Sequence, residues 1–143
     1  MTRRASRRDE RGTVTVWAVG MVVLTMILGG IAIDLWTGFA ARRELAAAVD
    51  QAAQAGANGL DEAVFRSSGV RQLDPDRARN LATESLAGQG LGDLDSVTVE
   101  ASTEQVVVDV TRSVDLGLLG LLGGGDPLIV HVRAVGQPRE VTP

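Results

Sequence analysis

Apolar residues are concentrated in one unbroken stretch near the N-terminus. Residues 13–33 read TVTVWAVGMVVLTMILGGIAI and contain no charged side chain. A helix of these 21 residues would be about 30 Å long, which is the thickness of a bilayer core. Trp17 and Trp36 lie 19 positions apart, a spacing that would put one indole ring at each membrane interface. The pattern therefore predicts a membrane-spanning helix, which we assign to residues 13–36.

A cleaved secretory signal peptide is the alternative interpretation of this stretch. It too has a basic segment followed by an apolar run, and Gly38, Phe39 and Ala40 form a passable small-x-small cleavage site. The apolar run of a signal peptide covers only about 7 to 15 residues, however. The longer run in this chain favours an uncleaved anchor.

The apolar pattern continues beyond the span as one face of a helix. Residues 37–60 are rich in alanine and contain no proline, so we expect a single helix of about 45 residues, part embedded and part amphipathic. Its predicted apolar stripe recurs at spacings of three, four and seven, and consists of Leu35, Phe39, Ala46, Val49, Ala53, Gly56 and Leu60. Such a narrow stripe of mostly small side chains favours close packing against another helix or a thin sheet.

Residues 61–143 predict a small head that combines helix and strand. We expect a linker over 61–73, and then a helix with Asp74 as N-cap and Pro75 at its first position. Apolar and polar residues alternate over 97–102 and 106–111, which predicts an antiparallel hairpin that turns at 102–105, and a third strand follows at 128–135. The fold class is therefore α+β: a long N-terminal helix, a second helix and a small three-stranded antiparallel sheet.

A leucine and glycine loop separates the second and third predicted strands. Residues 116–126 read LGLLGLLGGGD, a run too short to cross a bilayer. The loop either closes the bottom of the small core or forms an exposed apolar patch that contacts a partner subunit or the outer membrane surface. The residues concerned are Leu118, Leu119, Leu121 and Leu122.

Charge predicts the orientation of the span and limits the partners. Residues 1–12 carry five arginines and two acids, a net charge of +3. Because the whole chain has a net charge of −4, the remaining residues carry a net charge of −7. By the positive-inside rule we expect the N-terminus in the cytoplasm and the head outside. An acidic head with few aromatic residues is a poor candidate for nucleic acid. The expected first partner is the lipid bilayer.

Residues at the outer end of the span are candidates for helix packing. Asp34 is either a hydrated boundary residue or a carboxylate that pairs with a cation on a neighbouring helix or subunit. Gly29 and Gly30 would permit close helix approach or local bending.

Reactive side chains are scarce. The chain has no cysteine and a single histidine, His131, which excludes disulfides, thiol nucleophiles and zinc sites built from these residues. Asp93 and Asp95 stand in a glycine-bounded segment where aspartate is favoured for local backbone bonding. We find no catalytic constellation, and expect no enzyme activity, metal or cofactor.

The sequence from residue 11 to residue 57 resembles the N-terminal segment of TadE/TadG-like proteins of the tight-adherence (Flp, type IVc) pilus machinery. In that family a glycine precedes the span, an aspartate closes it, and a segment similar to ARRxLxxAxDxAAxAGA follows. The matching positions are Gly12, Asp34, Arg42, Arg43, Leu45, Asp50, Ala52, Ala53 and residues 55–57. The resemblance adds Leu45 and Asp50 to the candidate packing or assembly residues.

The resemblance implies a single-pass protein of the bacterial cytoplasmic (inner) membrane with a pilin-like shape. It would act as a minor pilin, pseudopilin or assembly factor, with other pilus subunits and inner-membrane assembly proteins as partners. Prepilin peptidase would cleave such a chain between Gly12 and Thr13, but its substrates typically carry glutamate where this chain has Trp17, which favours an uncleaved, TadG-like anchor. The alternative function is a membrane-anchored extracytoplasmic domain that binds an unrelated envelope partner.

Overall fold

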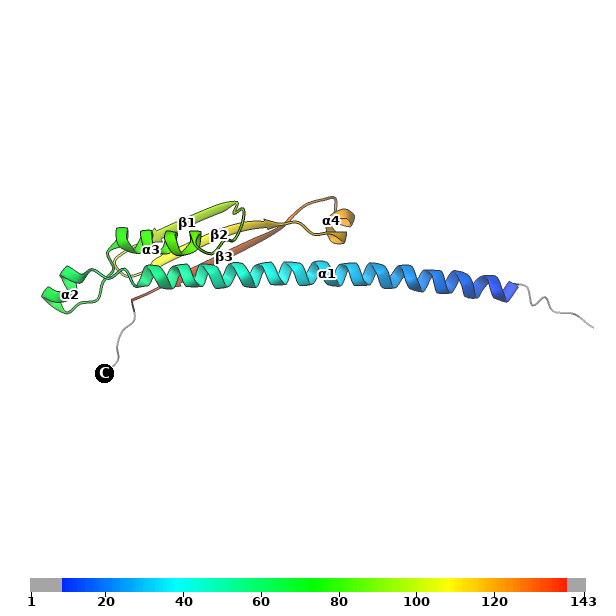
Figure 1. Cartoon of the computed structure of the whole chain (residues 1–143), viewed down its shortest axis with the longest axis horizontal. Coiled ribbons are helices and arrows are strands. Elements are labelled where there is room, and N and C mark those ends of the chain that lie inside the picture. The colour runs from blue at the N-terminus through cyan, green and yellow to red at the C-terminus, as the bar shows by residue number, and fades with distance from the viewer. Residues whose placement is uncertain (1–8, 139–143) are drawn as a thin grey trace, which may run out of the picture.

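A computed structural model describes residues 9–138, so residues 1–8 of the basic N-terminal segment and the tail from residue 139 lie outside the described chain. The elements in chain order are α1 (Asp9–Ala57), α2 (Glu62–Ser68), α3 (Pro75–Ala87), β1 (Ser96–Ala101), β2 (Val106–Val114), α4 (Leu118–Gly123) and β3 (Leu128–Gly136). Figure 1 shows α1 as a long rod, with the other elements gathered along its C-terminal half. This arrangement confirms the predicted α+β fold class.

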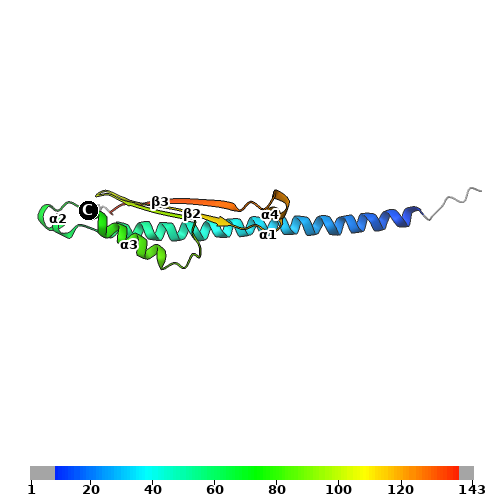
Figure 2. The ribbon, with the colours of Figure 1, turned by 90° about the horizontal axis from the view of Figure 1, so that it is seen from above.

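Helix α1 has two halves with opposite environments. It is 49 residues long, or about 74 Å, and its N-terminal half projects beyond the head in both views (Figures 1 and 2). The large apolar side chains of that half are exposed: Val14, Val16, Trp17, Val19, Met21, Val22, Val23, Leu24, Met26, Ile27 and Leu28. The prediction of one continuous helix over these residues is confirmed.

The C-terminal half of α1 forms the floor of the head, and its buried face matches the predicted stripe from Val49 onward but not at residues 35 and 39. Leu35 and Phe39 are 51% and 60% exposed, whereas Leu45 is fully buried. The prediction placed the large side chains near residue 35 on the packing face. In this part of α1 the face that meets the head consists of small residues instead, because small side chains let the head approach the helix closely. The stripe is confirmed at Val49, Ala53 and Gly56, which are buried, and at Leu60, which packs against the core.

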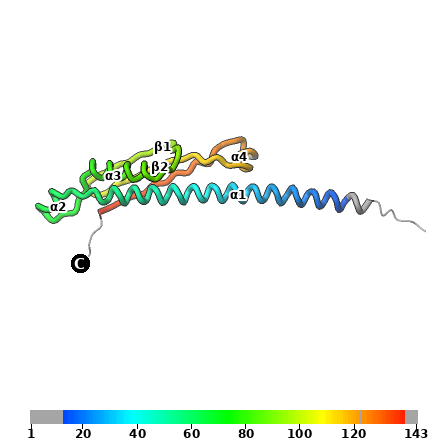
Figure 3. Tube along the Cα trace, in the orientation of Figure 1, coloured from blue at the N-terminus to red at the C-terminus, as the bar shows by residue number. Residues whose placement is uncertain are grey.

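The sheet is antiparallel with the strand order β1-β2-β3. Val97 pairs with Val110 and Ala101 with Val106, which confirms the predicted hairpin. One face of the sheet packs on α1 and α3, and the inward side chains of β2 form the centre of the core together with those of α1. The tube in Figure 3 follows β3 along α1 for the length of the head.

Strand β3 approaches α1 very closely at the C-terminal end of the strand. A Cβ on Gly136 would overlap the backbone carbonyl of Ala53, so only glycine allows the strand and the helix to lie this close there. Because this end is held tightly, the strand direction is set along the helix and the opposite end of the sheet points toward the projecting half of α1 (Figure 1).

The predicted linker over 61–73 is wrong in part, because it contains helix α2. Asp61 caps this helix by accepting hydrogen bonds of 3.0 Å from the amides of Ala63 and Val64, and Gly69 ends it with a φ of 72°. No residue of α2 is buried, so the segment has no apolar periodicity from which a helix could be predicted. The next helix, α3, begins as predicted, with Asp74 as N-cap and Pro75 in the first turn.

Candidate functional site at the junction of α1 and α4

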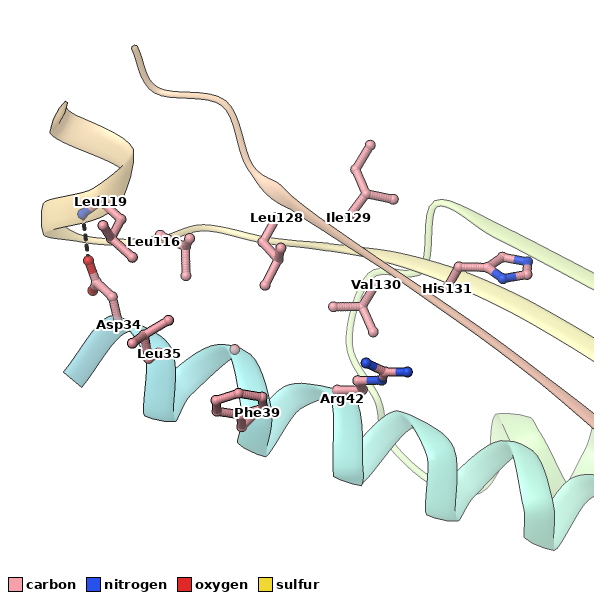
Figure 4. A pocket seen from close by; sticks show the side chains of 11 residues that line it. Asp34, Leu35, Phe39, Arg42, Leu116, Leu119, Leu128, Ile129, Val130 and His131 are labelled. Carbon is pink, nitrogen blue, oxygen red and sulfur yellow. Dashed lines mark hydrogen bonds between the residues drawn. The ribbon is translucent and has the colours of Figure 1, made fainter. Parts of the chain in front are cut away.

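Asp34 lies where the head meets the projecting half of α1. Its side chain is only 7% exposed. Oδ1 accepts a hydrogen bond of 3.0 Å from the amide of Gly117, and Oδ2 accepts one of 2.6 Å from the amide of Leu119. Figure 4 shows the carboxylate aimed at the first turn of α4. Asp34 therefore caps a helix that is 83 residues away in the chain.

The cap satisfies donors that α4 cannot satisfy itself. The residue before α4 is Gly117, which has no side chain to accept a hydrogen bond from the first turn. The first amides of any helix lack partners within the helix, and a carboxylate is a strong acceptor for them. A Cβ on Gly117 would lie 3.1 Å from Oδ1 of Asp34, so glycine leaves room for the carboxylate. The Asp34 carboxylate thus supplies the acceptor that the first turn of α4 lacks, and Gly117 supplies the space that the carboxylate needs.

Two glycines flank Asp34 on the same side of α1. Gly30, Asp34 and Gly38 recur every four residues, and we call this side the glycine face. Leu118 of α4 packs over Gly30, where a Cβ would come within 2.7 Å of Leu118 Cδ2, and Leu128 of β3 packs over Gly38, where the distance would be 3.0 Å. Residues on both sides of the loop between β2 and β3 therefore pack on the glycine face.

A groove of about 520 Å³ opens beside the glycine face, between α1 and the start of β3. Most of its lining is apolar, as in Figure 4, which shows Phe39 on α1 and Leu128 and Val130 on β3. Arg42 and His131 line it at the end farther from α4. His131 Nε2 lies 2.7 Å from Oδ1 of Asp109 on β2. The groove is thus apolar near α4 and polar at its other end.

The remaining predicted site residues fall in different surroundings. Gly29 faces open space, Leu45 lies in the core of the head, and Asp50 is exposed. Gly12 and Thr13 lie within the first turns of α1. The leucines of the loop also divide: Leu118 and Leu119 are half-buried, Leu121 is 80% exposed, and the side chain of Leu122 lies outside the described part of the structure.

The partners of Asp34 were missed by the sequence analysis. Neither of its two predicted roles, a hydrated boundary or a partner for a neighbour's cation, included a contact with the leucine and glycine loop. A partial signal is the pair of glycines on the same side of the helix as Asp34, Gly30 and Gly38, since small residues on one side of a helix mark a face of close approach, but this pattern does not indicate which segment approaches. Gly117 and Leu128, which meet this face, carried no signal of their own.

The junction offers packing surfaces and hydrogen bonds rather than reactive groups. Within residues 9–138 no three histidine, aspartate or glutamate side chains are grouped so that they could hold a metal ion. The one carboxylate at the centre, Asp34, already accepts two amides. What this arrangement can do is fix the position of α4 on α1.

Comparison with protein families identifies the segment that contains this junction. Residues 12–59 match the family model of putative Flp pilus-assembly TadE/G-like proteins. This segment is TadE/G-like. The match confirms the resemblance predicted from residues 11–57 and coincides with almost the whole of α1. The same search found no match among curated proteins or solved structures. The family is a structural and assembly family.

The TadE/G-like segment contains a helix that could cross a membrane. Among the described residues, α1 is the single helix that is long and apolar enough to do so, and none of its most apolar window is buried against the rest of the chain. This exposure distinguishes it from the core helix of a soluble protein, which would be covered. An apolar N-terminal helix and a TadE/G-like segment together fit a Flp pilus-associated membrane protein.

Proposed function

We propose that the protein is a single-pass component of a tight-adherence (Flp, type IVc) pilus apparatus in the bacterial inner membrane. The observation that carries the proposal is that one helix, α1, contains both the TadE/G-like segment and an apolar half that nothing in the described chain covers. Such a half has no stable place in water, since burying apolar surface is the main driving force for both folding and membrane insertion. The protein acts by packing, not by catalysis.

The proposed organisation has four parts along the chain. Residues 1–12 lie in the cytoplasm, 13–36 cross the membrane, 37–60 continue the same helix outside, and 61–143 complete the extracytoplasmic head. The last two parts act as one body, because α1 contributes Leu45 and the residues after it to the core of the head.

Within the apparatus we favour an uncleaved assembly factor over a processed pilin or pseudopilin. In a processed subunit the acid five residues after the cleaved glycine would pair with a neighbour's new amino group, and this chain has Trp17 at that position. An uncleaved chain keeps its arginine-rich segment, which would prevent the span from leaving the membrane. Its partners would be pilus subunits and inner-membrane assembly proteins that approach the open side of α1, where Gly29 leaves space.

Single-cysteine labelling tests the orientation and the processing together, because the natural chain has no cysteine. Ser6→Cys places a thiol before the span, and Val70→Cys places one on an exposed position of the head. With a membrane-impermeant maleimide on intact spheroplasts, we expect Val70→Cys to be labelled and Ser6→Cys to stay unlabelled. After lysis, both should be labelled on a membrane protein of full length.

Two results would contradict the proposal in different ways. If Ser6→Cys is labelled on intact spheroplasts, the orientation is reversed. If the chain carrying Ser6→Cys cannot be labelled even after lysis while Val70→Cys can, residues before Thr13 have been removed and the uncleaved anchor is wrong. The unsubstituted chain, which has no thiol, is the control for non-specific labelling.

A further inference from the structure

We propose that α4 is a membrane foot: a short apolar helix that inserts into the outer leaflet of the bilayer beside α1. The inference rests on the proposed span, and adds a second contact of the same chain with lipid. It concerns the loop between β2 and β3, in which Leu121 is the most exposed of the large side chains that the structure describes.

The position of α4 along the axis of α1 is the first argument. Leu118 packs over Gly30, which lies 17 residues after Thr13, or about 26 Å along the helix axis. Asp34, which caps α4, lies about 32 Å from Thr13 on the same scale. The apolar core of a bilayer is about 30 Å thick, so α4 lies level with its outer edge. A tilt of α1 toward the side that carries α4 brings α4 deeper.

The composition of the loop fits this level. Residues 116–125 are leucine and glycine only, and the run is bounded by Asp115 and Asp126, both exposed. Leu121 is 80% exposed, which is unfavourable in water and favourable in the acyl region of a lipid leaflet. The two aspartates mark the points where the loop would leave the apolar layer.

Four backbone amides in and beside α4 have hydrogen-bond acceptors within the protein, which favours a medium without water. In lipid, polar backbone groups must find partners within the protein. The amides of Gly117 and Leu119 donate to Asp34, that of Leu121 donates to the carbonyl of Gly117, and that of Gly125 to the carbonyl of Gly120. The cap by Asp34 therefore serves two purposes: it gives the amides of Gly117 and Leu119 an acceptor, and it gives a carboxylate at membrane level the donors it needs.

Lipid is favoured over a protein partner by the size and continuity of the surface. A stable protein interface buries more than about 1,000 Å² in total, whereas α4 is six residues long and two of its leucines, Leu118 and Leu119, are already half-buried. The exposed patch also continues at the same level around α1, where Ile33 and Trp36 are 68% and 71% exposed. One lipid layer would cover all of these side chains at once.

Tryptophan quenching by brominated lipids tests the foot in the full chain. In a Trp17→Phe and Trp36→Phe background, Leu121→Trp places the single reporter on α4, and the protein is reconstituted in phosphatidylcholine vesicles brominated on the acyl chains. We expect strong loss of emission, greatest when the bromines are near the carbonyl end of the chains, and unchanged at lower protein-to-lipid ratios. Because Leu121 is exposed, the larger indole ring meets no neighbour in the head.

Two further reporters separate the inference from the proposal on which it depends. Leu24→Trp lies in the middle of the span and should be quenched by bromines near the ends of the acyl chains, and Thr103→Trp lies in the hairpin turn far from α4 and should not be quenched. If Leu24→Trp is quenched and Leu121→Trp is not, the foot is refuted and the span stands. If Leu24→Trp is unquenched, the span itself is refuted. Quenching of Leu121→Trp that weakens as protein concentration rises would mean that a second copy covers α4, which also overturns the inference.

Discussion

Replacing Asp34 with alanine is expected to release α4 from α1 while the head stays folded. The substitution removes the acceptor of two backbone amides and leaves both donors without a partner. Hydrogen bonds to a charged group contribute about 1.5 to 3 kcal/mol each, so the docking of α4 should weaken by about 3 to 6 kcal/mol. Hydrogen exchange over residues 115–126, measured by mass spectrometry on protein in nanodiscs, should become much faster, with no change in β1 or α3.

Two variants make this experiment specific. Asp34→Asn keeps the shape of the side chain but offers one acceptor oxygen in place of two, so its exchange should lie between those of the natural chain and Asp34→Ala. Asp50→Ala removes an exposed carboxylate from the same helix and should leave exchange in the loop unchanged. Equal exchange in Asp34→Ala and Asp50→Ala would show that the cap does not hold α4.

Replacing Leu45 with alanine is expected to destabilise the whole head. Leu45 is fully buried and belongs to the core formed by α1, α3 and the sheet. Truncation of a buried leucine to alanine costs about 2 to 5 kcal/mol, because apolar contact is lost and a cavity remains. The midpoint of unfolding by guanidinium in detergent micelles, followed by pulse proteolysis of the head, should fall accordingly.

Leu35→Ala is the matched control, since the residue is also a leucine of α1 but is 51% exposed. We expect a change of less than about 1 kcal/mol in the free energy of unfolding, as for most surface positions. A greater loss of stability in Leu35→Ala than in Leu45→Ala would mean that the stripe predicted from sequence, and not the observed face, packs against the head.

Much of the fold was predictable because its signals are local. The alternation around Val97 and Val108 identifies strands, and Asp74 with Pro75 identifies the start of α3 by the chemistry of helix caps. The long helix was predictable from an apolar run followed by alanine. The face of α1 that packs was predictable only in part, since Leu35 and Phe39 continue the same periodicity as Val49. Which of two neighbouring faces of α1 packs against the head depends on where the sheet can approach the helix, and the local sequence does not show this.

The site was not predictable from local pattern, because its partners are far apart in the chain. Asp34 could be recognised as unusual, being a carboxylate at the end of an apolar span, and Leu119 as part of an unusual loop. Nothing in either segment indicates the other. The contact exists because the sheet runs back along α1 and brings the loop between β2 and β3 to the level of Gly30 and Gly38 (Figures 1 and 4).

The cap by Asp34 adds a contact between the head and α1 to the core that the two already share. The C-terminal half of α1 belongs to that core, Gly136 packs on Ala53 at the far end of the sheet, and Asp34 holds α4 at the near end. A head held along its whole length cannot rotate independently of α1, so the position of this helix determines which surface of the head faces a neighbour.

The presence of pili on the cell surface tests most directly whether the protein is a component of the pilus apparatus. The gene is deleted from its own bacterium, pili are counted by electron microscopy, and the full chain is returned on a plasmid. We predict that deletion abolishes or strongly reduces the tight-adherence pili and that the full chain restores them. An unchanged number of pili after deletion would contradict the proposed function.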